Sequence, residues 1–193
     1  MKDARISMLA RNLISYSLEL KAGENILIEL FDEGEDLVAE LVKEAYFVGA
    51  KPFISIKNRK LLRELISGTD AEHMANVGKY EAIRMKEMNA YIAIRGFNNA
   101  LEYSDIASEK MSIYRSKWVK PVHFDIRIPK TKWCLMNYPT RPMSQAANMS
   151  TEQFENFYFD VCSLDYSKMS KAMDPLVELM SKTDKVRITG VGT

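Results

Sequence analysis

The chain has 193 residues, of which 47% are apolar and 27% are charged, a composition typical of a folded globular protein. Its 27 lysine and arginine residues nearly balance its 26 acids, so charge gives no reason to expect binding to nucleic acid or to an anionic membrane. The two cysteines, Cys134 and Cys162, form neither a disulfide framework nor a metal pair by their spacing, which favours reduced thiols in a cytoplasmic protein.

Helical and extended patterns alternate from the start of the chain. Charged Asp3, Arg5 and Arg11 interrupt the first segment and no long apolar stretch occurs, so we expect neither a signal peptide nor a transmembrane helix. The predicted elements, in chain order, are a helix over 3–20, a strand over 25–30, a helix over 37–48, a strand over 52–56, helices over 59–67 and 70–88, a strand over 90–95 and a helix over 103–117.

The segment 119–129 is predicted as a strand or an extended link. Apolar residues alternate at Val122, Phe124, Ile126 and Ile128, with a proline at either end. Residues 133–137 then predict a fourth core strand, which the turn-forming residues 138–142 stop.

The last third of the chain reads as helical. Ser150 and Gln153 have the spacing of a helix-capping pair. The row Phe154, Phe157, Tyr158 and Val161 lies on one face of the helix that follows and is expected to be buried against the sheet domain or a second chain. Asp165 is expected to cap another helix running to about residue 182, with Pro175 either kinking it or starting a new helix. Residues 186–189 predict the start of a further strand.

Strands that alternate with helices predict a three-layer α/β/α domain with a mostly parallel sheet and a C-terminal helical extension. The expected domains are 1–138 for the sheet, 139–185 for the helical extension and 186–193 for the first strand of a further, catalytic domain. We expect that strand to continue beyond Thr193, because a strand is an unusual place for a natural end.

The acidic run from Asp32 to Asp36 follows the first strand, where ligands bind in parallel α/β sheets, and could hold a cation or a sugar hydroxyl. The simpler interpretation is that these acids open the second helix. Gly190 and Gly192 form a fragment of a nucleotide-binding pattern, and no complete phosphate-binding loop occurs.

Neither metal chemistry nor a cysteine nucleophile has a clear signature. His73 and His123 lie 50 residues apart, and Asp125 could join His123 on one face of a strand, but this pair does not supply the three ligands of a catalytic zinc. Cys134 in an apolar run and Cys162 near a helix end favour packing roles.

The polar and aromatic segment at the end of the fourth strand gives the candidate substrate-cavity residues, which are Asn137, Tyr138 and Arg141. A rigid turn with surface side chains is the alternative interpretation. The aromatic row of residues 154, 157, 158 and 159 could bind a ligand, but its helical spacing favours core or interface packing.

Three stretches of the last third carry a resemblance to a known family. They are KWCLMNYPTRPMSQAANM (Lys132–Met149), MSTEQFENFYFDVCSLDYSKMSKAMDP (Met149–Pro175) and LVELMSKTDKVRITGVGT (Leu176–Thr193), with weaker agreement over ARNLISYSLELKAGENILIEL (Ala10–Leu30). They resemble the thermophilic aminopeptidase family, the metallopeptidases called aminopeptidase T and aminopeptidase S. Family members have a similar Tyr-Pro-Thr turn followed by Met and Gln, but where proline and alanine are expected this chain has Arg141 and Pro142.

The resemblance implies the N-terminal portion of a hydrolase, a metal-dependent protease that removes N-terminal residues from peptides. It implies a homodimer that encloses the active site, and a divalent metal pair of zinc, cobalt or a similar ion in the full-length enzyme. The family's catalytic residues and metal ligands have no counterpart positions here, so no metal and no activity are expected of residues 1–193 alone. Two alternatives stay open, a small-molecule-binding domain that uses the strand ends near Asp32, Gly96 and Tyr138, and a non-catalytic interaction protein.

Overall fold

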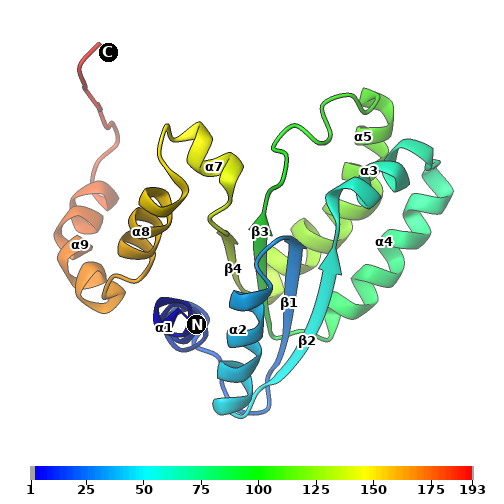
Figure 1. Ribbon diagram of the computed structural model, residues 1–193. Coiled ribbons are helices and arrows are strands. Elements are labelled where there is room, and N and C mark those ends of the chain that lie inside the picture. Colours follow the sequence, from blue (N-terminus) through cyan, green and yellow to red (C-terminus); the bar gives the residue numbers. More distant parts are fainter. Residues whose placement is uncertain (1–2, 193) are drawn as a thin grey trace. The chain divides into compact units, whose positions relative to one another are not determined.

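A parallel β-sheet organises the chain, whose computed structural model describes residues 3–192 (Figure 1). The strands are β1 (Asn25–Asp32), β2 (Lys51–Lys57), β3 (Ala90–Gly96) and β4 (Lys132–Asn137). Their order is β2-β1-β3-β4, and each adjacent pair is parallel. All four predicted strands are confirmed. The strand β4, predicted to lie in the core, is instead an edge strand with alternately half-buried and exposed side chains.

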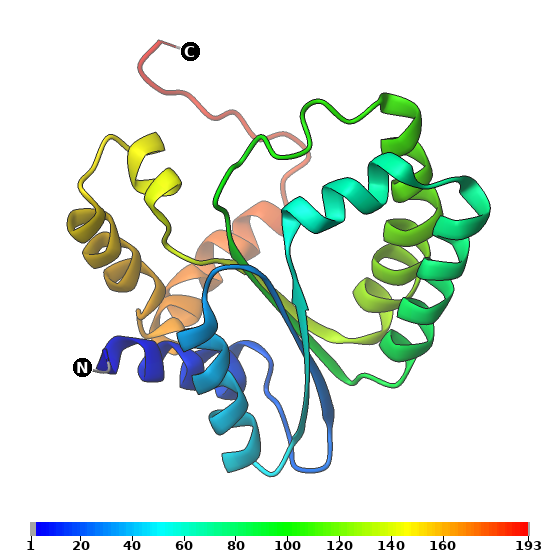
Figure 2. The ribbon, with the colours of Figure 1, turned by 45° about the vertical axis from the view of Figure 1, so that its right-hand side comes forward.

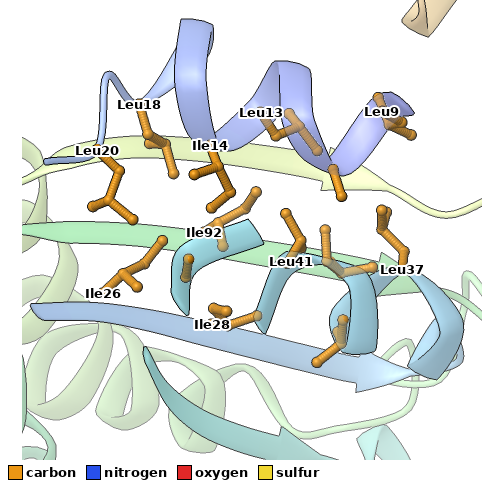
Figure 3. Close-up of a cluster of buried hydrophobic side chains, with 14 of the residues drawn as sticks. Leu9, Leu13, Ile14, Leu18, Leu20, Ile26, Ile28, Leu37, Leu41 and Ile92 are labelled. Atoms are coloured by element: carbon orange, nitrogen blue, oxygen red, sulfur yellow. The ribbon is translucent and has the colours of Figure 1, made fainter. Parts of the chain in front are cut away.

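One face of the sheet packs against helices that come both before and after the four strands in the sequence. It carries α1 (Ala4–Asn12), the π-helical turn η1 (Leu13–Ser17), α2 (Glu35–Phe47) and α8 (Thr151–Cys162). Figure 3 shows how leucine and isoleucine side chains fill the space between the sheet and the helices α1, η1 and α2. The fully buried members of this core include Leu9, Ile14, Leu18, Ile26, Ile28, Leu37, Leu41 and Ile92.

The opposite face packs against α3 (Arg59–Gly68), α4 (Ala71–Lys86), α5 (Ser108–Tyr114) and the π-helical segment η2 (Arg115–Arg127), as Figure 2 shows. Its core contains Leu27, Ile66, Met74, Met85, Tyr91, Ala93, Trp118 and Val122. Because strand side chains alternate between faces, Ile26 and Ile28 belong to the first core and Leu27 to the second. The predicted three-layer α/β/α architecture is therefore confirmed.

Local sequence explains where these helices begin. The side chains of Asn58 and Asp70 accept hydrogen bonds from the backbone at the first turns of α3 and α4, as polar residues at N-caps do. Ser150 does the same for α8 through the amide of Gln153, which confirms the predicted cap.

The strand or extended link predicted over 119–129 is wrong, because this segment is helical. Trp118, Val122 and Ile126 recur at a spacing of four and are all buried, whereas Phe124 is 61% exposed. Of the alternating apolar residues, only Val122 and Ile126 therefore face the core. Pro121 lies within η2, and the short helix α6 (Ile128–Lys130) continues from its end.

The aromatic helix α8 follows α7 (Arg141–Ala146) and presents a slightly different face to the core than the sequence predicts. Phe154, Tyr158 and Phe159 are buried, whereas Phe157 is 52% exposed and Val161 is 46% exposed. Phe159 is held by the guanidinium of Arg5, which lies 4.6 Å from its ring centroid. Within the described chain, Phe157 and Val161 are therefore not buried against the sheet, and their burial against a second chain stays a prediction.

The chain divides after Ser163 into two compact units. In the second unit, Asp165 caps α9 (Tyr166–Ser181) as predicted, and the helix continues through Pro175. Residues 186–189 form no strand, because no other described strand pairs with their backbone groups. Their assignment to a further domain stays a prediction, and Thr193 lies outside the described residues. None of the helices over residues 3–192 is long and apolar enough to cross a bilayer.

Candidate functional site

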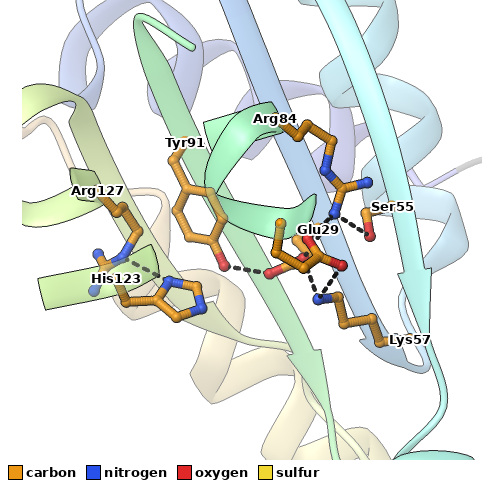
Figure 4. A network of polar contacts seen from close by, with 8 residues as sticks. Glu29, Ser55, Lys57, Arg84, Tyr91, His123 and Arg127 are labelled. Carbon is orange, nitrogen blue, oxygen red and sulfur yellow. Dashed lines mark hydrogen bonds and ion pairs between the residues drawn. The ribbon is translucent and has the colours of Figure 1, made fainter. Parts of the chain in front are cut away.

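The acid Glu29 lies in the middle of β1, a strand covered on both faces, where an apolar residue is the rule. Its side chain is only 2% exposed. The Nζ atom of Lys57 on β2 lies 3.0 Å from Oε1, and the hydroxyl of Tyr91 on β3 donates a hydrogen bond of 2.6 Å to Oε2. Three neighbouring strands thus converge on one carboxylate (Figure 4).

A second acid and a second base complete this network on α4. Glu81 lies 3.4 Å from Lys57 and forms an ion pair with Arg84, which itself lies 3.8 Å from Glu29 Oε1. Arg84 also donates to the Ser55 hydroxyl at 3.4 Å. The two acids and two bases balance in charge, so we interpret this network as a structural element that joins α4 to the sheet.

The network fixes the protonation of its members. Burial would raise the pKa of Glu29, but the charge of Lys57 and hydrogen bonds from Tyr91 and Lys57 outweigh it and leave the pKa below its ordinary value. Burial, followed by the charge of Glu29, raises the pKa of Tyr91 well above its usual range. At neutral pH the pair is therefore a carboxylate and a neutral phenol.

A cavity of about 420 Å³ lies next to this network, on the face covered by α3, α5 and η2. Phe31 on β1 and Arg95 on β3 line it and are register partners near the carboxyl ends of their strands. Ligands of parallel α/β sheets bind at these ends. The lining residues are Phe31, Arg59, Tyr91, Arg95, Phe97, Tyr103, Tyr114, Val119, His123, Phe124, Arg127 and Leu135.

Three arginines and no acid line this cavity. The guanidinium of Arg59 lies 4.7 Å from the ring centroids of both Phe97 and Tyr103. That of Arg127 lies 4.4 Å from the Trp133 ring and 5.3 Å from the Tyr91 ring. Aromatic rings thus hold two of the cations in place.

The histidine of the cavity stays uncharged at neutral pH. The pKa of His123 is lowered to about 4, mainly by burial; the charge of Glu29 opposes this shift, and the charges of Arg127, Lys57 and Arg95 add to it. The Nε–H of Arg127 donates a hydrogen bond of 3.2 Å to His123 Nδ1, which can accept it because the ring is neutral. The helical path of η2 brings these two residues, four apart in sequence, side by side.

The acidic residues that follow β1 lie at helix starts, as the simpler interpretation of the sequence predicts. Glu35 and Asp36 form the first turn of α2. The carboxylate of Asp32 accepts a hydrogen bond of 2.8 Å from the backbone of Arg59, at the start of α3. These carboxylates therefore serve helix starts. The glycines 190 and 192 lie in an irregular segment after α9.

The two histidines lie in different parts of the fold. His73 lies in the first turn of α4, next to Thr69, while His123 lines the cavity. Asp125 forms an ion pair of 3.0 Å with Lys120, because the helical path of η2 turns it away from His123. Among residues 3–192, no three His, Cys, Asp or Glu side chains are arranged to hold a metal ion. The described residues do not fit the metal pair that the resemblance implies, so no metal-dependent step is derived for them.

Both cysteines are partly buried. Burial raises the pKa of Cys134 and of Cys162, and the hydroxyl of Tyr158 lowers that of Cys162 only in part. Neither environment activates a thiolate.

The three candidate residues at the end of β4 are divided between the faces of the sheet. Asn137 is the register partner of Arg95 and shares its face, but Tyr138 packs against the first core, near Gly34. Arg141 begins α7 and is exposed. The cavity residues themselves do not include these three.

Sequence reasoning missed the main cavity residues, Arg59, Arg95 and Arg127. One signal was present, because Arg95 is a charged residue at the carboxyl end of an otherwise apolar strand. Glu29 gave a similar signal, because it is a charged residue in the middle of the apolar strand β1. Arg127 could not be found in this way, since its segment was interpreted as extended.

The fold defines a three-layer α/β/α protein with a parallel sheet and a ligand-sized cavity at the strand ends. The family model of the thermophilic metalloproteases (M29) matches residues 2–185. The chain therefore belongs to the thermophilic metalloprotease (M29) family.

Among solved structures, wild-type AmpT from Thermus thermophilus is 20% identical, with a TM-score of 0.63 over 82% of this chain and 42% of that chain. An alcohol dehydrogenase superfamily protein from Novosphingobium aromaticivorans is 13% identical over 84% of this chain and 49% of that chain, with a TM-score of 0.32, which carries no argument. No curated protein matches the chain. The chain thus spans less than half the length of the AmpT structure that it matches, whose likeness supports the fold.

Proposed function

We propose that this chain is the N-terminal portion of a metal-dependent aminopeptidase that hydrolyses N-terminal residues from peptides. The observation that carries this proposal is the match of the M29 family model to residues 2–185. In the proposal, a further half of the enzyme supplies the divalent metals, and this portion supplies cavity walls and dimer contacts. The span of 42% of the AmpT chain and the lack of a ligand cluster within residues 3–192 support it.

The test compares two proteins. One is residues 1–193, and the other is a longer protein in which the metal-binding half of an M29 family enzyme follows residue 193. Both are assayed on aminoacyl p-nitroanilides with added zinc or cobalt, and bound metal is measured. We expect turnover and bound metal in the longer chain, with activity lost to a chelator and restored by metal. Metal-dependent turnover by residues 1–193 alone would overturn the proposed division of labour.

A homodimer forms part of this proposal. The edge strand β2 exposes apolar side chains on both of its faces, and Phe53, Ile54 and Ile56 are 43%, 51% and 72% exposed. An edge strand with exposed apolar residues is a template for association. We expect residues 1–193 to self-associate through β2 in sedimentation velocity. The Ile56→Lys variant should shift the protein toward monomer, whereas the control Leu101→Lys, at a residue 72% exposed in the turn after β3, should not.

The cavity at the strand ends favours a second candidate function, the binding of a small molecule. Its volume of about 420 Å³ lies within the range of ligand pockets. The chemistry of its lining defines which class of ligand it would take.

A further inference from the structure

We propose that the cavity lined by Arg59, Arg95 and Arg127 binds a small organic oxyanion, a carboxylate or phosphate group carried on a flat apolar body. This inference does not depend on the proposed peptidase function. Its first support is the charge of the lining, which holds three guanidinium groups and no carboxylate.

The nearest acids form no ion pair with these cations within the described residues. Glu29 is engaged by Lys57 and Tyr91, and Figure 4 shows it on the other side of the Tyr91 ring from Arg127. Asp32 accepts a hydrogen bond from the backbone of Arg59 rather than from its guanidinium. Within residues 3–192, none of the three cavity arginines forms an ion pair with an acid.

Two of the arginines retain unused hydrogen-bonding capacity. Arg127 is only 6% exposed, and its Nη1 atom is buried without a hydrogen-bond partner. The side chain of Arg95 makes no hydrogen bond or ion pair within the described chain, although it projects from a rigid central strand. A buried guanidinium nitrogen without a hydrogen-bond partner, such as Nη1 of Arg127, is costly, and a bound anion would remove that cost.

The fields of the three cations overlap in the cavity. The charges of Arg95 and Arg127 both act on Tyr91 and His123, and those of Arg95 and Arg59 both act on Tyr114, in each case against the opposing charge of Glu29. Because His123 is neutral at pH 7 and accepts a bond from Arg127, it does not reduce this positive potential. Like charges that converge in a partly buried space attract a ligand of the opposite sign.

The aromatic residues that line the cavity indicate the shape of the apolar part of the ligand. Phe31, Phe97, Tyr103, Tyr114 and Phe124 surround the arginines. Aromatic walls favour a flat, apolar group by stacking and burial, and a guanidinium fork suits the two oxygens of a carboxylate or phosphate. An oxyanion on an aromatic ring satisfies both features.

The test measures binding to residues 1–193 by isothermal titration calorimetry. The probes are 3-phenylpropionate, phenyl phosphate, the uncharged amide 3-phenylpropionamide, and inorganic phosphate. We expect saturable binding of one or both aromatic anions, and the tighter of the two identifies the source of the oxyanion. The amide and inorganic phosphate should bind at least about tenfold more weakly, because each lacks one of the two recognised features.

Two variants assign the binding to this cavity. Arg95→Gln should weaken the aromatic anion by about tenfold or more, since it removes one charged partner without removing a native contact. Arg59→Gln is a second, independent test in case Arg95→Gln fails to fold. The control Arg63→Gln, on α3 outside the cavity, should bind as the unaltered protein does.

Three outcomes would overturn the proposal. The amide could bind as tightly as the acid, which would make the cavity a neutral apolar cleft. The folded variants Arg95→Gln and Arg59→Gln could both bind normally, which would place the ligand elsewhere. Finally, neither aromatic anion could give saturable binding.

Discussion

The hydroxyl of Tyr91 on β3 donates a hydrogen bond of 2.6 Å to the carboxylate of Glu29 on β1, inside the sheet. This bond separates two environments. On one side the acids and bases of the Glu29 network compensate each other, and on the other side the cations of the cavity do not. The Tyr91 ring, against which Arg127 packs, is the wall between them.

We expect Glu29→Gln to lower the free energy of unfolding by about 3 kcal/mol, because it leaves the Lys57 ammonium, 10% exposed, with only Glu81, at 3.4 Å, as an acid partner. Urea unfolding measures the change. The double variant Glu29→Met/Lys57→Met is the matched control and should lose less, since it removes both charges together. A Glu29→Gln variant as stable as the unaltered protein would show that the network contributes nothing.

The stability of the fold should depend on pH through His123. Its pKa is lowered from 6.5 to about 4 in the folded chain, mainly by burial, so between these values the unfolded chain binds more protons. The free energy of unfolding should therefore fall as pH falls from 6.5 to 4, by at most about 3 kcal/mol.

The variant His123→Gln isolates this effect, because its amide oxygen can accept the bond from Arg127 but does not titrate. Denaturant unfolding at pH 7 and pH 5 should show a smaller pH dependence in the variant. Equal dependence in the two proteins would mean that His123 titrates normally in the folded state.

Two phenylalanines on α8 should differ in their effect on stability. Phe159→Ala should destabilise by about 3–5 kcal/mol, because the ring is only 5% exposed. Phe157→Ala should cost far less in the monomer, since that ring is 52% exposed. Thermal unfolding at two protein concentrations checks both. A loss at Phe157 that grows with concentration would indicate that this ring packs against a second copy.

Gly78 in the middle of α4 should not tolerate alanine. A Cβ atom there would lie 2.1 Å from the Lys117 carbonyl oxygen of η2, although alanine normally stabilises a helix interior by about 1 kcal/mol. We expect Gly78→Ala to destabilise. Gly68→Ala is the control, since nothing lies within 4 Å of its Cβ position and it should be neutral or stabilising. Denaturant midpoints of the two variants, measured together, decide the sign.

The sequence determined the sheet, because short apolar runs such as residues 25–30 and 90–95 can be buried on both faces only as parallel strands between helices. It also determined helix starts at Ser150 and Asp165, since a cap depends on residues within one turn of it. Its resemblance to the thermophilic aminopeptidase family agrees with the family match over residues 2–185.

Only the tertiary structure decided the path of residues 119–129. The apolar residues Val122, Phe124, Ile126 and Ile128 fit a spacing of two, whereas Trp118, Val122 and Ile126 fit a spacing of four. In the folded chain, Trp118, Val122 and Ile126 are buried in one core, and only a helical path presents residues four apart to the same side. The same helix carried Arg127 to within reach of Arg95 and Arg59, which lie far away in sequence. The cavity exists because these three side chains meet at the strand ends, and such a meeting depends on how elements pack rather than on any local pattern.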